Sequence, residues 1–349
     1  MRARGVILCV LALVLLSSAA GAQEKNLLAL AGDLGAVLEW DPLRDMGVLS
    51  FGDDRIALGV GTGLALINYR RAVVIDPPAR RDGAVWLTTG AVAAISDAVQ
   101  NDRLAHAGER LRVAYLLLDP GHGGVEPGSI GSYLEGTKRV TLREKDVTLK
   151  IAQKLSGLLG KEYPDKEVVF TRADDRFVSL ENRTVIANTF LEKTSDAVLY
   201  VSIHANSTLN KSSKASGFEV WVLPPTYQRK LLDEKTVGRE NLDILPILNS
   251  MFEEEISVES VMLAQEILRG LDGSVGKVTG NRGLRQNDWY VVRNARMPAV
   301  LVEVGFVSSE EEAARLADDT YLNDVAAGIY TGIRAFVARF ERNGSGGAR

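Results

Sequence analysis

The stretch Val113-Ala-Tyr-Leu-Leu-Leu-Asp-Pro-Gly-His-Gly-Gly124 joins an apolar run to a short polar and glycine-rich turn. Val113–Leu118 has the length and composition of a β-strand. His122 follows this strand through Asp119-Pro-Gly121. Because ligands of open α/β sheets bind in the crevice beyond the carboxyl ends of the strands, His122 is a candidate functional residue.

From Val113 onward, apolar runs of strand length alternate with segments whose apolar residues recur at helical spacing. The predicted strands are Val113–Leu118, Val168–Thr171, Ala197–Ile203, Phe218–Leu223 and Ala299–Val304. The predicted helices are Val147–Leu158, Leu180–Leu191, Val261–Leu271 and Leu322–Phe340. This alternation predicts an α/β layered domain with a largely parallel or mixed sheet.

Two more predicted strands end in a polar side chain. His204 follows Val201-Ser-Ile203, and Glu303 follows Val300-Leu-Val302, so both could meet His122 at one edge of the sheet. A single histidine is more often structural than a ligand, but two at strand ends, each beside small residues, indicate a metal site with open access. A catalytic zinc takes three protein ligands and leaves a position for water, so a carboxylate is also required.

Glu144 is the leading candidate for this carboxylate, but a structural role competes with it. Thr141-Leu-Arg-Glu144 fits the capping box, in which a glutamate at the fourth position bonds back to the start of a helix. Spacing alone favours the capping role.

An ordered set of motifs extends over roughly residues 113–340. It consists of Leu117-Leu-Asp-Pro-Gly-His-Gly-Gly124, Glu144-Lys-Asp146, Thr171-Arg-Ala-Asp174, Glu181-Asn-Arg183, Ala187-Asn188, Ser202-Ile-His-Ala-Asn206 and Val302-Glu-Val-Gly-Phe306. The set resembles the zinc-dependent N-acetylmuramoyl-L-alanine amidases of bacterial cell walls, the amidase type 3 family. These enzymes hydrolyse the amide bond between N-acetylmuramic acid and L-alanine in peptidoglycan.

The resemblance implies a three-layer α/β/α catalytic domain with a mixed sheet. It also implies that His122, Glu144 and His204 bind Zn²⁺ and that Glu303 is the catalytic acid/base. On this basis the metal-ligand role of Glu144 replaces the capping role. Glu303 would then accept a proton from the attacking water and deliver it to the leaving nitrogen.

Other charged residues have competing interpretations. Glu303 could instead form an ion pair with a nearby arginine such as Arg293, because a bare carboxylate in an apolar strand is unfavourable. Glu219, in the strand Phe218–Leu223, is given a structural role. Arg172 and Arg183 could bind substrate carboxylates, and structural pairing with Asp174 or Glu181 is an equal alternative.

Residues 224–258 interrupt the amidase-like pattern. They begin with Pro224-Pro225, are rich in charge, become apolar at Leu242–Leu248 and end in Glu253-Glu254-Glu255 and the residues after them. Some amidases that this chain resembles carry here a helix that blocks the active site through a zinc-bound glutamate. Ile247–Ile256 could do the same, with one of the three glutamates as the zinc ligand. An activator protein would then release the helix from the active site. A solvated acidic helix is the alternative.

The amino terminus predicts export. Residues 1–22 combine Arg2 and Arg4, an apolar run from Gly5 to Leu16 and the small residues Ala20-Gly-Ala22, which together are typical of a signal peptide. A periplasmic or extracellular location in the cell envelope follows. No later apolar stretch is long enough for a membrane span, and Cys9, the only cysteine, lies within the signal peptide.

Residues 23–104 predict a small, strand-rich α+β domain, with helices at Leu27–Leu34 and around Val92–Val99. With Leu34-Gly-Ala36, Glu39-Trp-Asp-Pro42 and a later hydrophobic hairpin, the segment resembles the copper amine oxidase N-terminal-like domain of bacterial envelope enzymes. It offers no histidine cluster to bind copper. Whether this domain binds the cell wall or a partner protein, or is only a spacer, stays open. A linker at 105–112, with His106 exposed to solvent, precedes the catalytic domain at 113–341, and 342–349 form a flexible tail.

Composition narrows the class of protein further. The chain carries a formal net charge of −4, which gives no indication of nucleic-acid binding. It has no H-E-x-x-H helix, C-x-x-C pair or G-x-S-x-G elbow. Two rivals remain: a zinc peptidase acting on stem peptides, and a non-catalytic wall-binding or hydrolase-activating envelope protein. Since such non-catalytic proteins usually lose a ligand or the acid/base, the presence of all four residues favours the enzyme.

Overall fold

The computed structural model describes residues 24–41, 45–51, 54–68, 71–105, 112–194, 196–208, 215–231 and 245–343. The predicted signal peptide, His106 and most of the predicted tail lie outside these residues. The chain forms two compact units. Val113–Tyr227 and Ile256–Ala338 make up the larger unit, and the smaller unit takes the residues before Val113 together with Gln228–Glu255 and the chain from Arg339.

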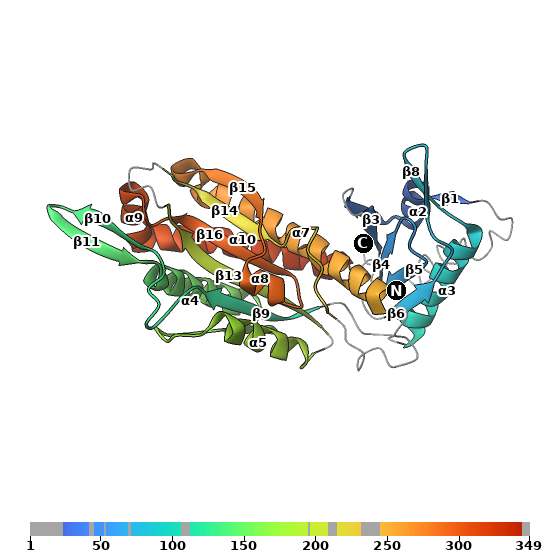
Figure 1. Ribbon diagram of the computed structural model, residues 1–349, viewed down its shortest axis with the longest axis horizontal. Helices are drawn as coiled ribbons and strands as arrows, with labels where there is room; N and C mark the ends of the chain where they lie inside the picture. The colour runs from blue at the N-terminus through green and yellow to red at the C-terminus, as the bar shows by residue number, and fades with distance from the viewer. Residues whose placement is uncertain are drawn as a thin grey trace, which may run out of the picture. The chain divides into compact units, whose positions relative to one another are not determined.

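A six-stranded sheet forms the centre of the larger unit (Figure 1). Its order is β12 (Glu167–Phe170), β9 (Val113–Pro120), β13 (Ala197–Asn206), β16 (Ala299–Phe306), β14 (Phe218–Val222) and β15 (Asn281–Gln286). The first four strands are parallel, whereas β14 runs antiparallel to β16 and parallel to β15. The mixed sheet and all five predicted strands are confirmed.

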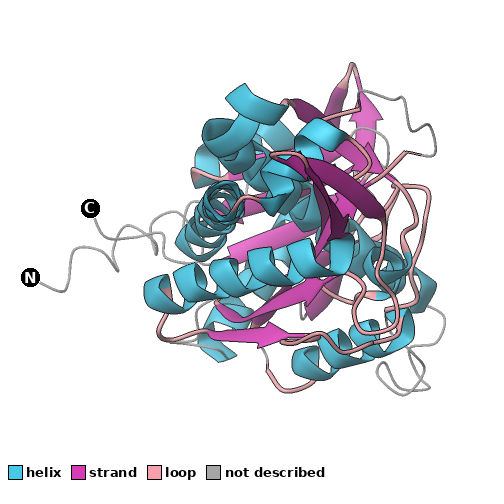
Figure 2. Ribbon diagram, turned by 90° about the vertical axis from the view of Figure 1, so that its left-hand side faces the viewer, coloured by secondary structure: helices cyan, strands magenta, loops and turns pink. Residues whose placement is uncertain are grey.

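Helices cover both faces of this sheet (Figure 2). On one face, Leu117, Tyr200 and Leu301 pack in a buried cluster that includes residues of α5 (Leu180–Leu191) and α8 (Tyr290–Asn294). Since neighbouring residues of a strand point to opposite faces, Leu116 and Leu118 are buried on the other side. The three-layer α/β/α architecture is therefore confirmed.

The other face carries three helices, of which α10 (Asp319–Asn343) contacts both α4 (Glu144–Glu162) and the part of α7 (Leu245–Thr279) within the larger unit. Lys154 of α4 donates to Asp319 of α10 at 2.9 Å. A Cβ atom on Gly270 of α7 would lie 2.2 Å from the carbonyl oxygen of Gly328 in α10, so α7 and α10 touch through their backbones. A further short helix, α9 (Glu310–Ala317), follows β16.

A β-hairpin that the sequence analysis missed projects from the larger unit (Figure 1). It consists of β10 (Ile130–Glu135) and β11 (Lys138–Arg143), joined through Gly136 at φ +64°. Gly131 lies against the backbone at Val307, because a Cβ there would be 1.6 Å from the Val307 oxygen. β11 ends at Arg143 and α4 begins with the next residue, so the hairpin fixes the position of Glu144.

The smaller unit is the predicted strand-rich α+β fold. It contains an antiparallel sheet of β2 (Val37–Asp41), β3 (Met46–Phe51), β4 (Asp54–Gly59), β5 (Leu64–Ile67) and β6 (Arg71–Val74), and a second sheet of β1 (Lys25–Asn26), β8 (Ala84–Leu87) and β7 (Ala79–Arg81). Helix α2 has the predicted bounds, Leu27–Leu34, and is followed by Gly35 in the left-handed conformation, whereas α3 (Thr89–Ala105) extends the second predicted helix at both ends.

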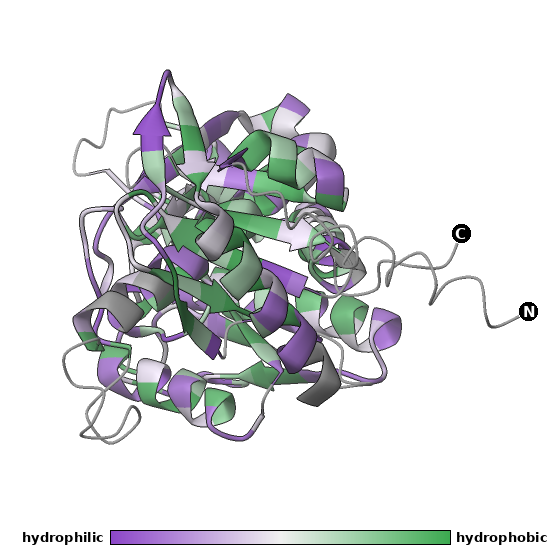
Figure 3. Cartoon of the chain, turned by 90° about the vertical axis from the view of Figure 1, so that its right-hand side faces the viewer, coloured by the Kyte–Doolittle hydropathy of each residue, from purple (hydrophilic) through white to green (hydrophobic). Residues whose placement is uncertain are grey.

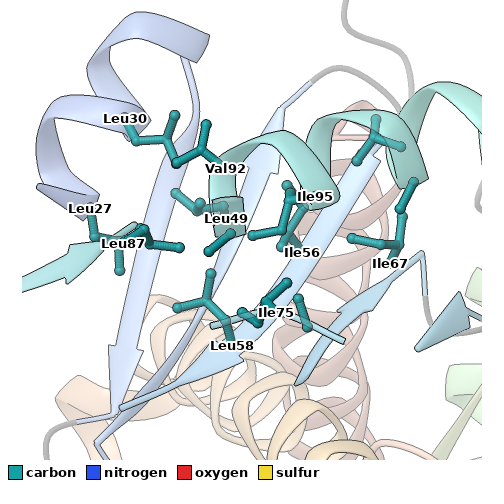
Figure 4. Packing of buried hydrophobic residues seen from close by; sticks show 14 of the residues in the cluster. Leu27, Leu30, Leu49, Ile56, Leu58, Ile67, Ile75, Leu87, Val92 and Ile95 are labelled. Atoms are coloured by element: carbon teal, nitrogen blue, oxygen red, sulfur yellow. The ribbon is translucent and has the colours of Figure 1, made fainter. Parts of the chain in front are cut away.

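The core of the smaller unit lies between these two helices and the five-stranded sheet (Figure 4). Leu30 of α2 and Ile95 of α3 pack against Leu49 and Ile56 of the strands. Several strands seen from this side carry hydrophobic segments (Figure 3), and the sequence places such segments at Val48–Leu49 of β3 and Ile56–Leu58 of β4. Burial of this apolar surface is the main stabilising contribution to such a fold.

Segments remote in sequence complete the smaller unit. Phe252, in the first part of α7, packs against a cluster that includes Val48 and Leu66. The guanidinium carbon of Arg55 lies 4.2 Å from the ring centroid of Phe340, near the end of α10. The compact units thus do not follow chain order. Among the described helices, none combines the length and apolar character that a membrane span requires.

Candidate metal centre

The three predicted ligands meet at the carboxyl ends of the central strands. His122, Glu144 and His204 each offer one ligand atom, and the three atoms lie within 4.8 Å of one another. His122 Nε2 is 3.3 Å from Glu144 Oε2, and His204 Nδ1 is 2.9 Å from Glu144 Oε1. The two imidazole centroids are 5.1 Å apart. Within the described chain, no other group of three histidine, cysteine or acidic residues reaches this proximity.

Glycines make room for the two imidazoles. A Cβ on Gly121 would lie 2.3 Å from Cε1 of His204. A Cβ on Gly128 would lie 2.6 Å from Cδ2 of His122 and 2.7 Å from Glu144 Oε2. His122 itself has a φ of +60°, a conformation that is strained for a non-glycine residue and has to be held by its surroundings.

Two buried arginines hold the backbone of the His122 loop. Arg172 donates from Nη2 to the Gly121 oxygen at 2.8 Å, and Arg183 donates from Nη2 to the His122 oxygen at 2.6 Å. Their residues are 1% and 2% exposed, so neither is available to a substrate carboxylate. The predicted ion pairs with Asp174 or Glu181 are also wrong. Arg172 donates to backbone carbonyl oxygens, and Arg183 donates to the carboxylate of Asp119.

Asp119 anchors this loop to the sheet. Its carboxylate accepts hydrogen bonds from four side chains: Arg183 at 2.6 Å, Thr171 at 2.5 Å, Tyr200 at 2.7 Å and Ser202 at 2.7 Å. Burial alone would raise the pKa of Asp119, but the charge of Arg183 and the three hydroxyl groups together lower it. The ionised carboxylate therefore stabilises the turn that presents His122.

Glu144 does not cap a helix. The residue preceding α4 is Arg143, which makes no side-chain cap, and Thr141 lies within β11. The two carboxylate oxygens instead accept backbone N–H groups, Oε1 from Ala205 at 3.1 Å and Oε2 from Ser129 at 2.8 Å. Burial alone would raise the pKa of Glu144, but hydrogen bonds to His122 and His204 outweigh it and hold the pKa below its ordinary value.

Glu303 lies beside this group. It is the register partner of His204 across the parallel pair of β16 and β13. Its Oε2 is buried and has no hydrogen-bond partner among the described residues. Burial, and then the charges of Glu144 and Glu219, raise its pKa well above the ordinary value. The alternative of an ion pair with Arg293 is wrong, because Arg293 contacts Asp288 at 3.4 Å.

Glu219 is the cross-strand partner of Glu303 in β14 and is 2% exposed. It accepts a hydrogen bond from Asn206 Nδ2 at 2.7 Å and one from Arg282 Nε at 2.8 Å. These contacts agree with the predicted structural role. The sequence analysis did not identify Arg282, which lies in a polar edge strand without an apolar pattern to indicate it.

The segment Ile247–Ile256, for which a blocking role was predicted, is helical and lies within α7. Glu253 is engaged elsewhere: Arg229 donates to its two oxygens at 2.6 and 2.9 Å, within the smaller unit. Blocking by one of the three glutamates therefore stays a prediction. Residues 232–244 of the insertion lie outside the described residues.

The donor set fits a zinc ion. Two imidazoles and one carboxylate are the ligands of many catalytic zinc sites, which keep a further position for water. The unpartnered oxygen of Glu303 adds a buried acceptor next to the three ligands. An isolated buried carboxylate is unfavourable without a partner, so this atom is suited to bind a proton or a donor from a ligand.

Comparisons with known proteins find amidases. Residues 116–335 match the family model described as N-acetylmuramoyl-L-alanine amidase. The chain is 30% identical over 242 residues to the amidase AmiC of Escherichia coli O6:H1 (strain CFT073), covering 66% of this chain and 54% of AmiC. It is 28% identical over 218 residues to the sporulation-specific N-acetylmuramoyl-L-alanine amidase of Bacillus subtilis, covering 62% of this chain and 66% of that protein.

Among solved structures, the amidase AmiC2 of Nostoc punctiforme is 30% identical, with 65% of this chain and 98% of that chain covered and a TM-score of 0.48. This chain spans about half of the length of AmiC and less than two thirds of most of the first relatives. The family match does not reach the residues before 116, so the resemblance of residues 23–104 to a copper amine oxidase N-terminal-like domain stays a prediction. From the matched region, which is well over half of its length, this chain belongs to the N-acetylmuramoyl-L-alanine amidase family.

Proposed function

We propose that the protein hydrolyses the amide bond between N-acetylmuramic acid and L-alanine in peptidoglycan, and that it uses zinc. The observation that carries the proposal is the convergence of His122, Glu144 and His204 within 4.8 Å, with Glu303 paired in register with His204. Family membership supports the choice of bond.

His122, Glu144 and His204 would hold the ion. When bound, zinc supplies a Lewis acid that lowers the pKa of water towards about 7 and polarises a carbonyl group. The chain's own contribution to proton transfer is Glu303. Its unpartnered Oε2 accepts the proton of the attacking water as the new C–O bond forms, and returns that proton to the leaving nitrogen as the C–N bond breaks.

The residues around the ligands keep this arrangement rigid. Asp119, Arg172 and Arg183 fix the loop of His122, and two backbone N–H groups orient the Glu144 carboxylate. Such pre-organisation matters because a displacement of about 1 Å at a catalytic group can reduce the rate on the order of 100-fold.

The first experiment is mass spectrometry of peptidoglycan sacculi digested by residues 23–349, with and without a chelator. We expect stem peptides that begin with a free L-alanine amino group, loss of this product with the chelator and its recovery with added zinc. Release at another peptide bond would identify a zinc peptidase instead. Binding to sacculi without any product would identify a non-catalytic wall-binding protein.

The matched variant is Glu303→Gln, which keeps the size of the side chain and removes its ability to take a proton. We expect bound zinc to remain near one equivalent by elemental analysis while the rate falls on the order of 100- to 10,000-fold. His122→Ala should lose both zinc and activity. A Glu303→Gln protein with a normal rate would refute the mechanism.

We further propose that the protein acts in the periplasm or at the extracellular face of the cell envelope after removal of residues 1–22, and that an activator protein acts on residues 224–258. The substrate, which is part of the cell wall, supports the location. Fractionation of cells followed by amino-terminal sequencing tests it. An increased basal rate after Glu254→Gln or Glu255→Gln would support the blocking role of this segment, and unchanged rates in both would argue against these two residues.

A further inference from the structure

Two arginines lie on the edge strand β15, close to the metal centre. The side chains of Arg282 and Arg285 are 37% and 46% exposed. Both turn Nε towards the same atom, Oε2 of Glu219, at 2.8 Å for Arg282 and 3.7 Å for Arg285. A single buried carboxylate therefore binds Arg282 through a hydrogen bond and has Arg285 within ion-pair range.

These arginines belong to a row of side chains that starts at the metal centre. His204, Glu303 and Glu219 are successive register partners on β13, β16 and β14. Residues directly opposite each other on neighbouring strands point to the same face of a sheet, and Arg282 continues the row through its hydrogen bond to Glu219. Only Glu219 separates the arginines from Glu303.

The spacing suits a short peptide. Neighbouring strands are about 4.8 Å apart, so β15 lies roughly 10 Å from β16 across the sheet. An extended peptide advances about 3.3 Å per residue, and the distance therefore corresponds to roughly three residues. A peptide whose scissile amide is at Glu303 can place a group of its next residues within reach of an arginine side chain.

The arginines retain capacity for an anion. Arg282 uses Nε for Glu219, and its guanidinium carbon lies 5.0 Å from the ring centroid of Phe306, so the group is held in place. Among the described residues, the two Nη atoms of Arg282 have no hydrogen-bond partner and Glu219 is the one carboxylate in ion-pair range of either arginine. Two positive charges against one negative charge leave an excess that favours a carboxylate, which a guanidinium group binds through paired hydrogen bonds.

We propose that Arg282 and Arg285 recognise the free carboxylate of the residue that follows L-alanine in the substrate's peptide, and thereby determine specificity. The inference rests on the proposed function. In peptidoglycan that residue is a glutamate linked through its side chain, so its α-carboxyl group is either a free carboxylate or an amide. The arginines select the charged form, because the amide has no charge and offers one acceptor atom in place of two.

The test uses two substrates that differ in this group alone: N-acetylmuramoyl-L-alanyl-D-glutamate and N-acetylmuramoyl-L-alanyl-D-isoglutamine. With the zinc-loaded protein we expect kcat/KM for the glutamate form to be about tenfold higher, mainly through a lower KM. Arg285→Ala should bring the ratio of the two kcat/KM values towards one. This variant keeps the 2.8 Å bond between Arg282 and Glu219, so the buried carboxylate stays paired.

Arg282→Lys provides a second variant, because it keeps the positive charge but loses the forked geometry, and it should lower the ratio less than Arg285→Ala does. Arg269→Ala is the matched control: its side chain on α7 is 63% exposed and pairs with Glu266, and it should leave the ratio unchanged.

The outcomes separate the inference from the function. Equal cleavage of both substrates by the unmodified protein overturns the inference and leaves the amidase function intact. An equal loss of rate on both substrates in the two variants also overturns it, because the arginines would then act on Glu303 through Glu219 rather than on substrate. Failure to cleave either substrate, together with no product from sacculi, would reject the function itself.

Discussion

Asp119 links the buried sheet to the loop that carries His122, and its charge makes that link pH-dependent. Its pKa is lower in the folded protein than the ordinary value of 3.8. A carboxylate of this kind stabilises the fold at pH values above its unfolded pKa, and the stabilisation is lost as the pH falls through the folded pKa. The contribution is therefore complete at neutral pH and is lost below about pH 4.

Asp119→Asn should lower the free energy of unfolding at pH 7 by about 3–5 kcal/mol, because it leaves Arg183 buried without its partner. The stability of the variant should also fall less steeply than that of the unmodified protein below pH 4. Urea denaturation at pH 7 and at pH 3 measures both effects. Glu135→Gln, at an exposed carboxylate on β10, is the control, and equal losses in the two variants would show that burial of Asp119 is unimportant.

The sequence picked out His122, Glu144 and His204, which the structure brings together, and Glu303 beside them, but local spacing alone assigned Glu144 to a cap. The metal-ligand role of Glu144 could be predicted only from the resemblance, because its backbone hydrogen-bond donors, Ala205 and Ser129, are not its neighbours in the sequence. Arg282 and Arg285 were not identified either, because no local sequence pattern marks them. Arg282 acquires its significance from a pairing of strands that residue spacing does not encode.

At the scale of elements, the contact between α7 and α10 depends on glycines. A Cβ on Gly270 would lie 2.2 Å from the Gly328 oxygen and 2.9 Å from the Gly332 nitrogen, both backbone atoms. Gly273, one turn further along α7, has no atom within 4 Å of such a Cβ. The two positions thus differ in packing while sharing one helix.

Gly273→Ala should raise the free energy of unfolding by about 0.5–1 kcal/mol, because alanine favours helix. Gly270→Ala has the same helical advantage, but the helices must separate to admit the methyl group, so we expect a net loss of about 1–2 kcal/mol. Thermal unfolding of the two variants measures the difference. A stabilised Gly270→Ala protein would mean that the helices do not touch at this point.

Strands and helices with a strong apolar pattern were predicted well, and those without one were missed. The strands of β10 and β11 are largely exposed or half-buried, and β15 is a polar edge strand, so neither shows the run or alternation that marks a buried strand. The hairpin nevertheless decides where Glu144 lies. Elements stabilised by pairing rather than by burial thus escape a search for hydrophobic periodicity.

At the scale of the whole molecule, the last turn of α10 belongs to the smaller unit. Arg55 donates to the Phe340 oxygen at 3.3 Å, and Arg339 forms an ion pair with Glu39. A chain that ends at Ala338 should therefore show faster hydrogen exchange in β2 and β4, with exchange in β9 and β13 unchanged. A chain that ends at Glu341 is the control, and identical exchange in the two truncations would mean that these contacts do not stabilise the smaller unit.

The sequence predicted two regions but placed the border by position along the chain. The structure groups Gln228–Glu255 and the chain from Arg339 with the amino-terminal residues, because side chains such as Phe252 and Phe340 pack there. Contacts between residues hundreds of positions apart leave no mark in local composition. Such a grouping of segments can be recognised only in the folded structure.

The reversed direction of β14 has a consequence for how the family can diversify. In a wholly parallel sheet, only the segments that leave the strands open onto the reactive edge. Here β14 begins at the same edge, because its second residue, Glu219, is the antiparallel partner of Glu303. Insertions before or after a strand can therefore reach the edge where His122, His204 and Glu303 lie, without a change in the strands that carry these residues.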